Sequence, residues 1–267
     1  MEIRKLTILG GQGKDGKAEA VRQVELAMGQ VVSIVGPTGC GKTTLINDIE
    51  LFANENTPSR RRILINGAPT VADSLVDPSH NPVALISQHT SFLSDLPVRT
   101  FLETHARIRG ALRADTIVGE TLEFANQLTG EPLIQTSAMT ELSGGQTRAL
   151  LIADAVVIGQ SPIILLDEIE NAGIHRTRAL ELLRRYEKIF LFVTHDPRIA
   201  LLSDFRIVLR AGGMQEVIET NEEEQKVADE IRKLDDLLLE FRQRIRQGER
   251  LGYGMLEERL RALGYLA

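Results

Sequence analysis

The segment GPTGCGKT at residues 36–43 constrains the fold of this chain more than any other stretch. The apolar run VVSIV at residues 31–35 precedes it and predicts a strand, and TLINDIELF after it predicts a helix. A glycine-rich turn in that position matches the pattern G-x-x-x-x-G-K-[ST]. Its glycines let backbone N–H groups turn towards phosphate oxygens, next to the positive end of a helix. The segment therefore predicts a phosphate-binding loop.

Each residue of this loop is a candidate for nucleotide binding. Lys42 can reach the β and γ phosphates, and the Thr43 hydroxyl can ligate Mg²⁺. Cys40 is either a redox-sensitive thiol or simply a small side chain that fits the turn, and we favour the second interpretation. The full set of candidates is Gly36, Pro37, Thr38, Gly39, Cys40, Gly41, Lys42, Thr43 and Thr44.

Strand-like and helix-like patterns alternate along the rest of residues 1–219. The apolar runs VALIS, IILLD and IFLFV predict further strands, at residues 83–87, 163–167 and 189–193. This alternation predicts an α/β fold with a mainly parallel sheet covered by helices. A helix-rich stretch at about residues 90–160 interrupts the pattern, and we interpret it as an inserted helical subdomain.

Two adjacent acids, Asp167 and Glu168, end the apolar run IILL. Carboxylates are rarely left in a core, so the pair is expected at the exit of the strand. A phosphate-binding loop needs a distant acid to hold Mg²⁺ through water, and Asp167 is the candidate. Glu168 is then placed to orient or deprotonate the attacking water. The alternative is an acid pair that only caps a turn, and the phosphate loop favours the first interpretation.

Composition narrows the class of protein. The single cysteine excludes an internal disulfide and suits a reducing compartment. The beginning MEIRKLTILGG lacks the apolar region of a signal peptide, and no apolar run approaches the roughly 18–20 residues of a membrane span. We expect a cytoplasmic protein without direct membrane insertion. The net charge of −6 argues against nucleic acid as a partner, and the basic run Arg60–Arg62 is interpreted as a solvated loop.

The composition changes near residue 220, where a charged and periodic stretch begins. Asn221 followed by Glu224 predicts a helix start. A heptad seam follows, and Gly248 and Gly252 then allow the chain to reverse. Residues 220–267 are predicted to form a helical hairpin or a short coiled coil, with a slight preference for the hairpin. The seam is Val227, Ile231, Leu234, Leu238, Phe241 and Ile245, and the residues expected to cover it are Leu256, Leu260 and Leu263.

The motif LSGGQ at residues 142–146, taken with the motifs above and their order, resembles the ATP-binding-cassette (ABC) ATPases. The resemblance covers about residues 1–218. Gln88 resembles the Q-loop glutamine, and His195 in FVTHD resembles the switch histidine. The family fold implies a P-loop NTPase core, an N-terminal antiparallel β part and an ABC-type helical subdomain.

The resemblance implies a reaction and a set of partners. The cofactors are ATP and Mg²⁺, with Thr43, Gln88 and Asp167 near the metal and with Glu168, His195 and Gln88 as catalytic residues. Ser143, Gly144, Gly145 and Gln146 would bind ATP held by the phosphate loop of a second cassette, in a homodimer or a heterodimer. An integral membrane subunit would dock near Phe92, Leu93, Leu96, Val98 and Phe101; core packing is the alternative role of these residues.

Two departures from the family pattern stand out. The family stacks adenine on an aromatic residue near the first strand, whereas the first aromatic here is Phe52. Ile8, Leu9 or another chain would have to serve instead. The loop after Glu168 reads IENAGIH, with Ile174 or His175 where the family has an aspartate that links the two cassettes.

Three functions are compatible with these motifs. The first is an ATP-hydrolysing subunit that drives transport through separate membrane subunits. The second is a soluble ABC ATPase that remodels or activates a protein or cofactor assembly. The third, ranked last because of the single cassette and the negative charge, is an ABC ATPase associated with nucleic acid.

Overall fold

A six-stranded sheet in the order β10-β9-β3-β8-β7-β6 forms the centre of the first unit, residues 1–219. The computed structural model describes residues 2–70, 81–87, 90–111, 113–167 and 176–266. All neighbouring strands of this sheet are parallel except β9 and β10. The strands are β3 Val31–Val35, β6 Val83–Ile86, β7 Ile163–Asp167, β8 Ile189–Val193, β9 Phe205–Arg210 and β10 Gly213–Glu219.

The side chains of the central strands alternate between two cores, as the period of a strand requires. Ile164 and Leu166 of β7 point into one core, and Ile163 and Leu165 point into the other. All four are fully buried. Strands covered on both faces read as continuous apolar runs, which is why IILL and IFLFV predicted buried strands correctly.

A second, antiparallel sheet has the order β2-β1-β4-β5 and covers one face of the central sheet together with α1. Its strands are β1 Lys5–Leu9, β2 Gln23–Ala27, β4 Arg62–Ile65 and β5 Ala68–Pro69, and α1 spans Lys42–Glu50. Strand β2 alternates exposed and buried residues because only one of its faces meets the core. The antiparallel part is the one that the family resemblance implied.

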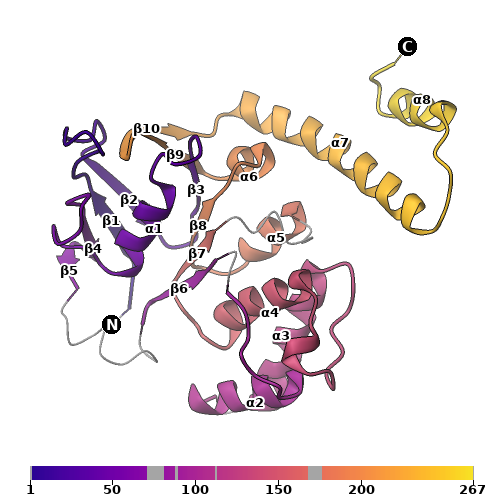
Figure 1. Ribbon diagram of the computed structural model, residues 1–267, viewed down its shortest axis with the longest axis horizontal. Helices are drawn as coiled ribbons and strands as arrows, with labels where there is room; N and C mark the ends of the chain where they lie inside the picture. Colours follow the sequence, from indigo (N-terminus) through magenta and orange to yellow (C-terminus); the bar gives the residue numbers. More distant parts are fainter. Residues whose placement is uncertain (1, 71–80, 88–89, 112, 168–175, 267) are drawn as a thin grey trace. The chain divides into compact units, whose positions relative to one another are not determined.

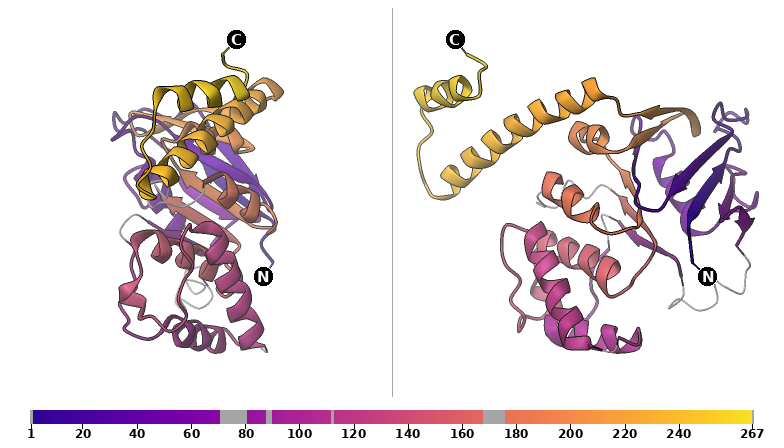
Figure 2. Two further views of the ribbon diagram at one scale, coloured as in Figure 1. Left: turned by 90° about the vertical axis from the view of Figure 1, so that its right-hand side faces the viewer. Right: turned by 180° about the vertical axis from the view of Figure 1, so that it is seen from behind.

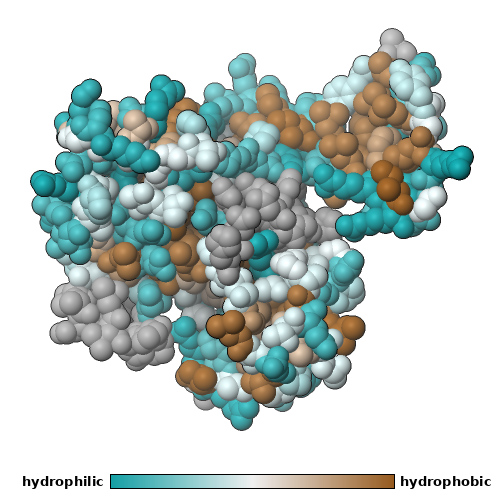
Figure 3. Space-filling view, in the orientation of Figure 1, coloured by the Kyte–Doolittle hydropathy of each residue, from teal (hydrophilic) through white to brown (hydrophobic). Residues whose placement is uncertain are grey.

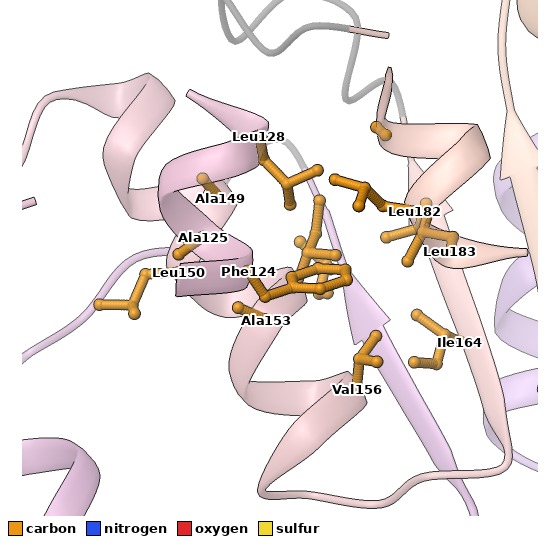
Figure 4. Close-up of a cluster of buried hydrophobic side chains, with 14 of the residues drawn as sticks. Phe124, Ala125, Leu128, Ala149, Leu150, Ala153, Val156, Ile164, Leu182 and Leu183 are labelled. Atoms are coloured by element: carbon orange, nitrogen blue, oxygen red, sulfur yellow. The ribbon is translucent and has the colours of Figure 1, made fainter. Parts of the chain in front are cut away.

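Helices cover the other face of the central sheet (Figure 1). Three of them, α2, α3 and α4, gather beside the sheet as a group of their own, which the views in Figure 2 also show. Figure 4 shows Phe124 of α3 among Leu128, Leu182 and Ile164, so the helices and β7 share one core. The helices are α2 Val98–Ile108, α3 Ala114–Leu128, α4 Gly144–Val157, α5 Arg176–Leu183 and α6 Pro197–Leu202, with a short 3₁₀ helix at Met139–Glu141. The predicted α/β class with an inserted helical subdomain is confirmed.

The second unit, residues 220–267, consists of α7 Glu222–Arg246 and α8 Tyr253–Ala262. Asn221 caps α7 by accepting a hydrogen bond from the Glu224 backbone N–H. Helix α8 returns along α7, because Arg259 bonds to Glu240 at 2.7 Å and the Tyr265 hydroxyl bonds to Glu230 at 2.6 Å.

Much of the heptad seam of α7 is exposed. Val227, Leu238 and Ile245 are 50%, 53% and 59% exposed, whereas Leu237, outside the seam, is only 8% exposed. Figure 3 shows hydrophobic residues along this unit accordingly. The hairpin interpretation predicted that Leu256, Leu260 and Leu263 cover the seam, and the exposure of Val227, Leu238 and Ile245 contradicts it at these three positions.

Candidate functional site

The register of the parallel strands brings three of the predicted site residues to one edge of the central sheet. Ile34 pairs with Val193, and Val193 pairs with Asp167, so β3, β8 and β7 end in one row. The phosphate loop starts two residues after Ile34, and His195 lies two residues after Val193. Ligands of open α/β sheets bind at the carboxyl ends of the strands, and this edge is where those ends lie.

Glycine is required in the phosphate loop for two physical reasons. Gly36, Gly39 and Gly41 have positive φ values of 151°, 75° and 101°, which side chains rarely tolerate. A Cβ atom on Gly36 would also lie 2.4 Å from the Leu209 carbonyl oxygen. Gly41 caps α1, so the backbone N–H groups of the first helical turn face the loop.

Lys42 lies across the loop rather than in solvent. Its side chain is buried, and its Nζ donates to the carbonyl oxygens of Gly36 at 3.0 Å and Pro37 at 3.2 Å. An ammonium group held in the curve of such a loop is placed to meet phosphate oxygens. Pro37, Thr38, Thr43 and Thr44 are exposed, whereas Cys40 is buried.

The acidic and switch residues are only partly described. Asp167 ends β7 and is half-buried, and His195 is exposed just beyond β8. Asp196 caps α6 by accepting from the Arg198 backbone N–H at 2.9 Å, which sets the path of the chain after His195. Gln88, Glu168, Ile174 and His175 lie outside the described residues.

The LSGGQ segment begins α4 with a complete capping box. Ser143 Oγ accepts from the Gln146 N–H at 3.3 Å, and Gln146 Oε1 accepts from the Ser143 N–H at 3.0 Å. The Gln146 amide also donates to the Pro132 carbonyl. Ser143 and Gly144 are exposed, and a Cβ atom on Gly144 would meet no atom of the described chain within 4 Å. Packing within the described chain therefore does not explain the glycine at position 144.

Ile8 cannot serve as an adenine platform, because it is fully buried within β1. Leu9 is partly exposed. The basic run Arg60–Arg62 is also not the solvated loop that its charge predicted. Arg61 is fully buried and paired with Glu19 and Asp48. A separation of 42 residues between Arg61 and Glu19 leaves no local pattern that would have predicted the pair.

Comparison with known proteins gives the family. The model of the family described as "ABC transporter" matches residues 22–171. An ABC transporter ATP-binding protein from Methanocaldococcus jannaschii is 51% identical over 251 residues, which are 94% of this chain and 96% of that protein. The sulfate/thiosulfate import ATP-binding protein of Thermosynechococcus vestitus is 30% identical over 76% of this chain. This chain spans only 60% of that importer protein's length.

Among solved structures, an ATP-binding cassette determined as a dimer after hydrolysis, with ADP and phosphate, resembles this fold. The TM-score is 0.61 at 23% identity, covering 81% of this chain and 99% of that one. The fold and the edge of the sheet thus define a P-loop nucleotide-binding protein. Within that class, the chain belongs to the ABC transporter family of ATP-binding proteins and is an ATPase.

Proposed function

We propose that this chain is the ATP-hydrolysing subunit of a transporter, and that two cassettes close around ATP to drive separate membrane subunits. The observation that carries the proposal is the meeting of the phosphate loop, Asp167 and the start of the 194–196 segment at one edge of the sheet. The relatives described as import ATP-binding proteins support the transport role.

The donor set at this edge fits Mg²⁺. Among the described residues, no group of three His, Cys, Asp or Glu side chains could hold a metal alone. An ion held by the exposed Thr43 hydroxyl, the Asp167 carboxylate and nucleotide phosphates needs no such group, because Mg²⁺ keeps several waters. Bound there, it would neutralise charge on the β and γ phosphates.

Within this proposal each chain residue has a separate task. The loop N–H groups and Lys42 bind the phosphates, and Glu168 accepts the proton of the attacking water. His195 and Gln88 would contact the γ-phosphate and the metal shell. Ser143 and Gly144 would complete the ATP site of a second copy of the chain. The absence of a side chain at Gly144 would let the nucleotide held by that copy come close to the start of α4.

The proposed membrane subunit would bind the segment before α2. Leu93 is 97% exposed and Leu96 is 44% exposed, and Phe92 packs edge-on against Phe101 at 5.1 Å between ring centroids. Val98 is fully buried, so it belongs to the core and not to this surface. In the part of the chain that the structure describes, no helix combines the length and the apolar character of a membrane span.

Substitution of the proposed base tests the mechanism. Glu168→Gln removes the proton acceptor with little change in shape, so ATP turnover should fall by about 10²–10⁴-fold while ATP still binds. Steady-state phosphate release and light scattering with ATP measure turnover and dimer size. Lys42→Ala is the matched control that should lose ATP binding itself. Wild-type turnover by Glu168→Gln would refute the assignment of the base.

A further inference from the structure

The loop between β1 and β2 contacts the phosphate loop through a lysine. Lys14 Nζ donates to the Gly39 carbonyl oxygen at 2.8 Å, and the Lys14 backbone N–H donates to the Ala211 carbonyl at 2.8 Å. The lysine stem also lies tightly over Gly212, where a Cβ atom would be 2.6 Å from Lys14 Cγ. The path of this exposed side chain is thus set by the turn beneath it.

The turn between β9 and β10 supports the phosphate loop from a neighbouring point. The Gly212 N–H donates to the Cys40 carbonyl at 2.9 Å, and a Cβ atom on Gly41 would lie 3.0 Å from Gly212 Cα. Two consecutive carbonyls, those of Gly39 and Cys40, are therefore held by groups outside the loop.

A buried ion cluster, Glu19, Asp48 and Arg61, joins these supports. Arg61 donates to Asp48 at 2.8 Å, to Glu19 through Nε at 3.1 Å, and to the Gly212 carbonyl at 2.8 Å. All three side chains are at most 2% exposed. The Arg61 guanidinium thus links α1, the β1–β2 loop and the β9–β10 turn.

Glu19 extends the cluster to the backbone on both sides. It accepts from the Gly11 N–H at 2.8 Å and from the Met214 N–H at 2.6 Å. Gly11 lies three residues before Lys14, and Met214 lies two residues after Gly212. The Glu19 carboxylate is held by Arg61 and by these two backbone N–H groups. The segments that contain Gly11 and Met214 are therefore fixed relative to Arg61.

From these contacts, we propose that Lys14 is a positioning residue for nucleotide binding, presented to the phosphate loop by the Glu19–Asp48–Arg61 cluster. The inference rests on the proposed function of the loop. The bond from Lys14 to the Gly39 carbonyl oxygen restricts the phosphate loop to fewer conformations. Less conformational entropy is therefore lost when phosphate binds. The ammonium charge also adds positive potential beside the phosphates.

The proposal has a consequence for specificity. Residues 1–51 contain no aromatic side chain that could stack on a base. The support from Lys14 acts on the phosphates, whatever the base. Affinity should therefore follow the number of phosphates, and the loss on removing Lys14 should be equal for ATP and GTP.

Lys14→Met tests the proposal, because Lys14 is exposed and its loss should leave the chain folded. Lys14→Arg keeps the charge, and Lys17→Met removes a lysine of the same loop that is 84% exposed and pairs only loosely with Asp15 at 3.5 Å. Calorimetric titration gives Kd for ATP, GTP, ADP and AMP, phosphate release gives KM and kcat, and thermal melting without nucleotide checks folding.

Lys14→Met should bind ATP, GTP and ADP about tenfold more weakly, with AMP binding, kcat and melting temperature nearly unchanged. Lys14→Arg should recover most of the affinity, and Lys17→Met should match the wild type. An unchanged Kd for ATP in Lys14→Met overturns the proposal, as does an equal loss in Lys17→Met or in Lys14→Arg. If the wild-type chain itself binds no nucleotide, the proposed function fails instead.

Discussion

At the scale of single residues, the burial of the Arg61 charge is a feature that the local sequence does not predict. Burial disfavours its charged form, but hydrogen bonds and charges from Glu19 and Asp48 outweigh that cost and raise the pKa of Arg61. Removal of one partner from such a group leaves an uncompensated charge, which typically costs several kcal/mol. Replacement of the exposed Lys14, unlike that of Arg61, leaves no buried charge without its partner, so its effect on the phosphate loop can be measured in a folded chain.

Lys188 makes a pH-dependent contribution to stability. It donates to the Ser161 carbonyl at 2.8 Å, and burial lowers its pKa from 10.5 to about 8. Between these two pH values the unfolded chain binds more protons than the folded chain, so the free energy of unfolding rises with pH. Below the lower value both states are charged and the cost of burial is fully present.

We expect the wild type to gain stability relative to Lys188→Met as pH rises through this window, by on the order of 1–3 kcal/mol because partial exposure to solvent screens the charge. Urea unfolding at a series of pH values measures the difference, and Lys17→Met serves as a control for the loss of an exposed lysine. Parallel stability curves for the wild type and Lys188→Met would contradict the lowered pKa.

At the scale of elements, two helices start with the same kind of cap but differ in what the cap faces. Ser143 caps α4 at the LSGGQ segment, and Asn221 caps α7 in the second unit. Both accept a backbone N–H three residues on, so each should stabilise its helix by a similar amount. The difference is that the first cap belongs to the proposed site of a second copy.

Ser143→Ala and Asn221→Ala should each lower stability by about 1 kcal/mol. ATP turnover should fall several-fold in Ser143→Ala alone, because its hydroxyl and the helix start are proposed to face the γ-phosphate. Chemical denaturation and phosphate release on the two variants measure both effects. Equal ATP turnover in the two variants would refute the proposed role of the LSGGQ segment in the ATP site.

At the scale of the whole molecule, the proposed sandwich divides each site between two chains. Lys42 and Ser143 of one chain would serve different sites. A chain with Lys42→Ala keeps an intact LSGGQ segment, and a chain with Ser143→Arg keeps an intact phosphate loop. Their mixed dimer would contain one complete site and one site with both defects.

Each variant alone should be nearly inactive, and an equal mixture should recover up to about a quarter of wild-type turnover if chains exchange at random in a symmetric dimer. Phosphate release before and after mixing measures the recovery, with Lys42→Ala mixed with Lys42→Ala/Ser143→Arg as the control. No recovery, despite exchange of labelled chains, would exclude the shared site.

The sequence by itself determined the phosphate loop, the buried strands of the parallel sheet and the helix starts at Ser143 and Asn221. These features depend on contacts within a few residues or on the period of apolar side chains, and both can be identified from the sequence. The apolar run IILL placed Asp167 at the end of its strand, and the family resemblance singled out His195. The register of β3, β8 and β7 brings the strand ends into one row.

Only the tertiary structure decided which charged and apolar residues are buried. From the sequence Arg61 was interpreted as one of three solvated arginines, but in the structure it is buried and paired with Glu19 and Asp48. From the sequence Ile8 was a candidate adenine platform, but in β1 it is fully buried. The seam of α7 was predicted to be covered, but Val227, Leu238 and Ile245 are exposed. Burial depends on partners that lie far apart in the chain, so no local pattern could have specified it.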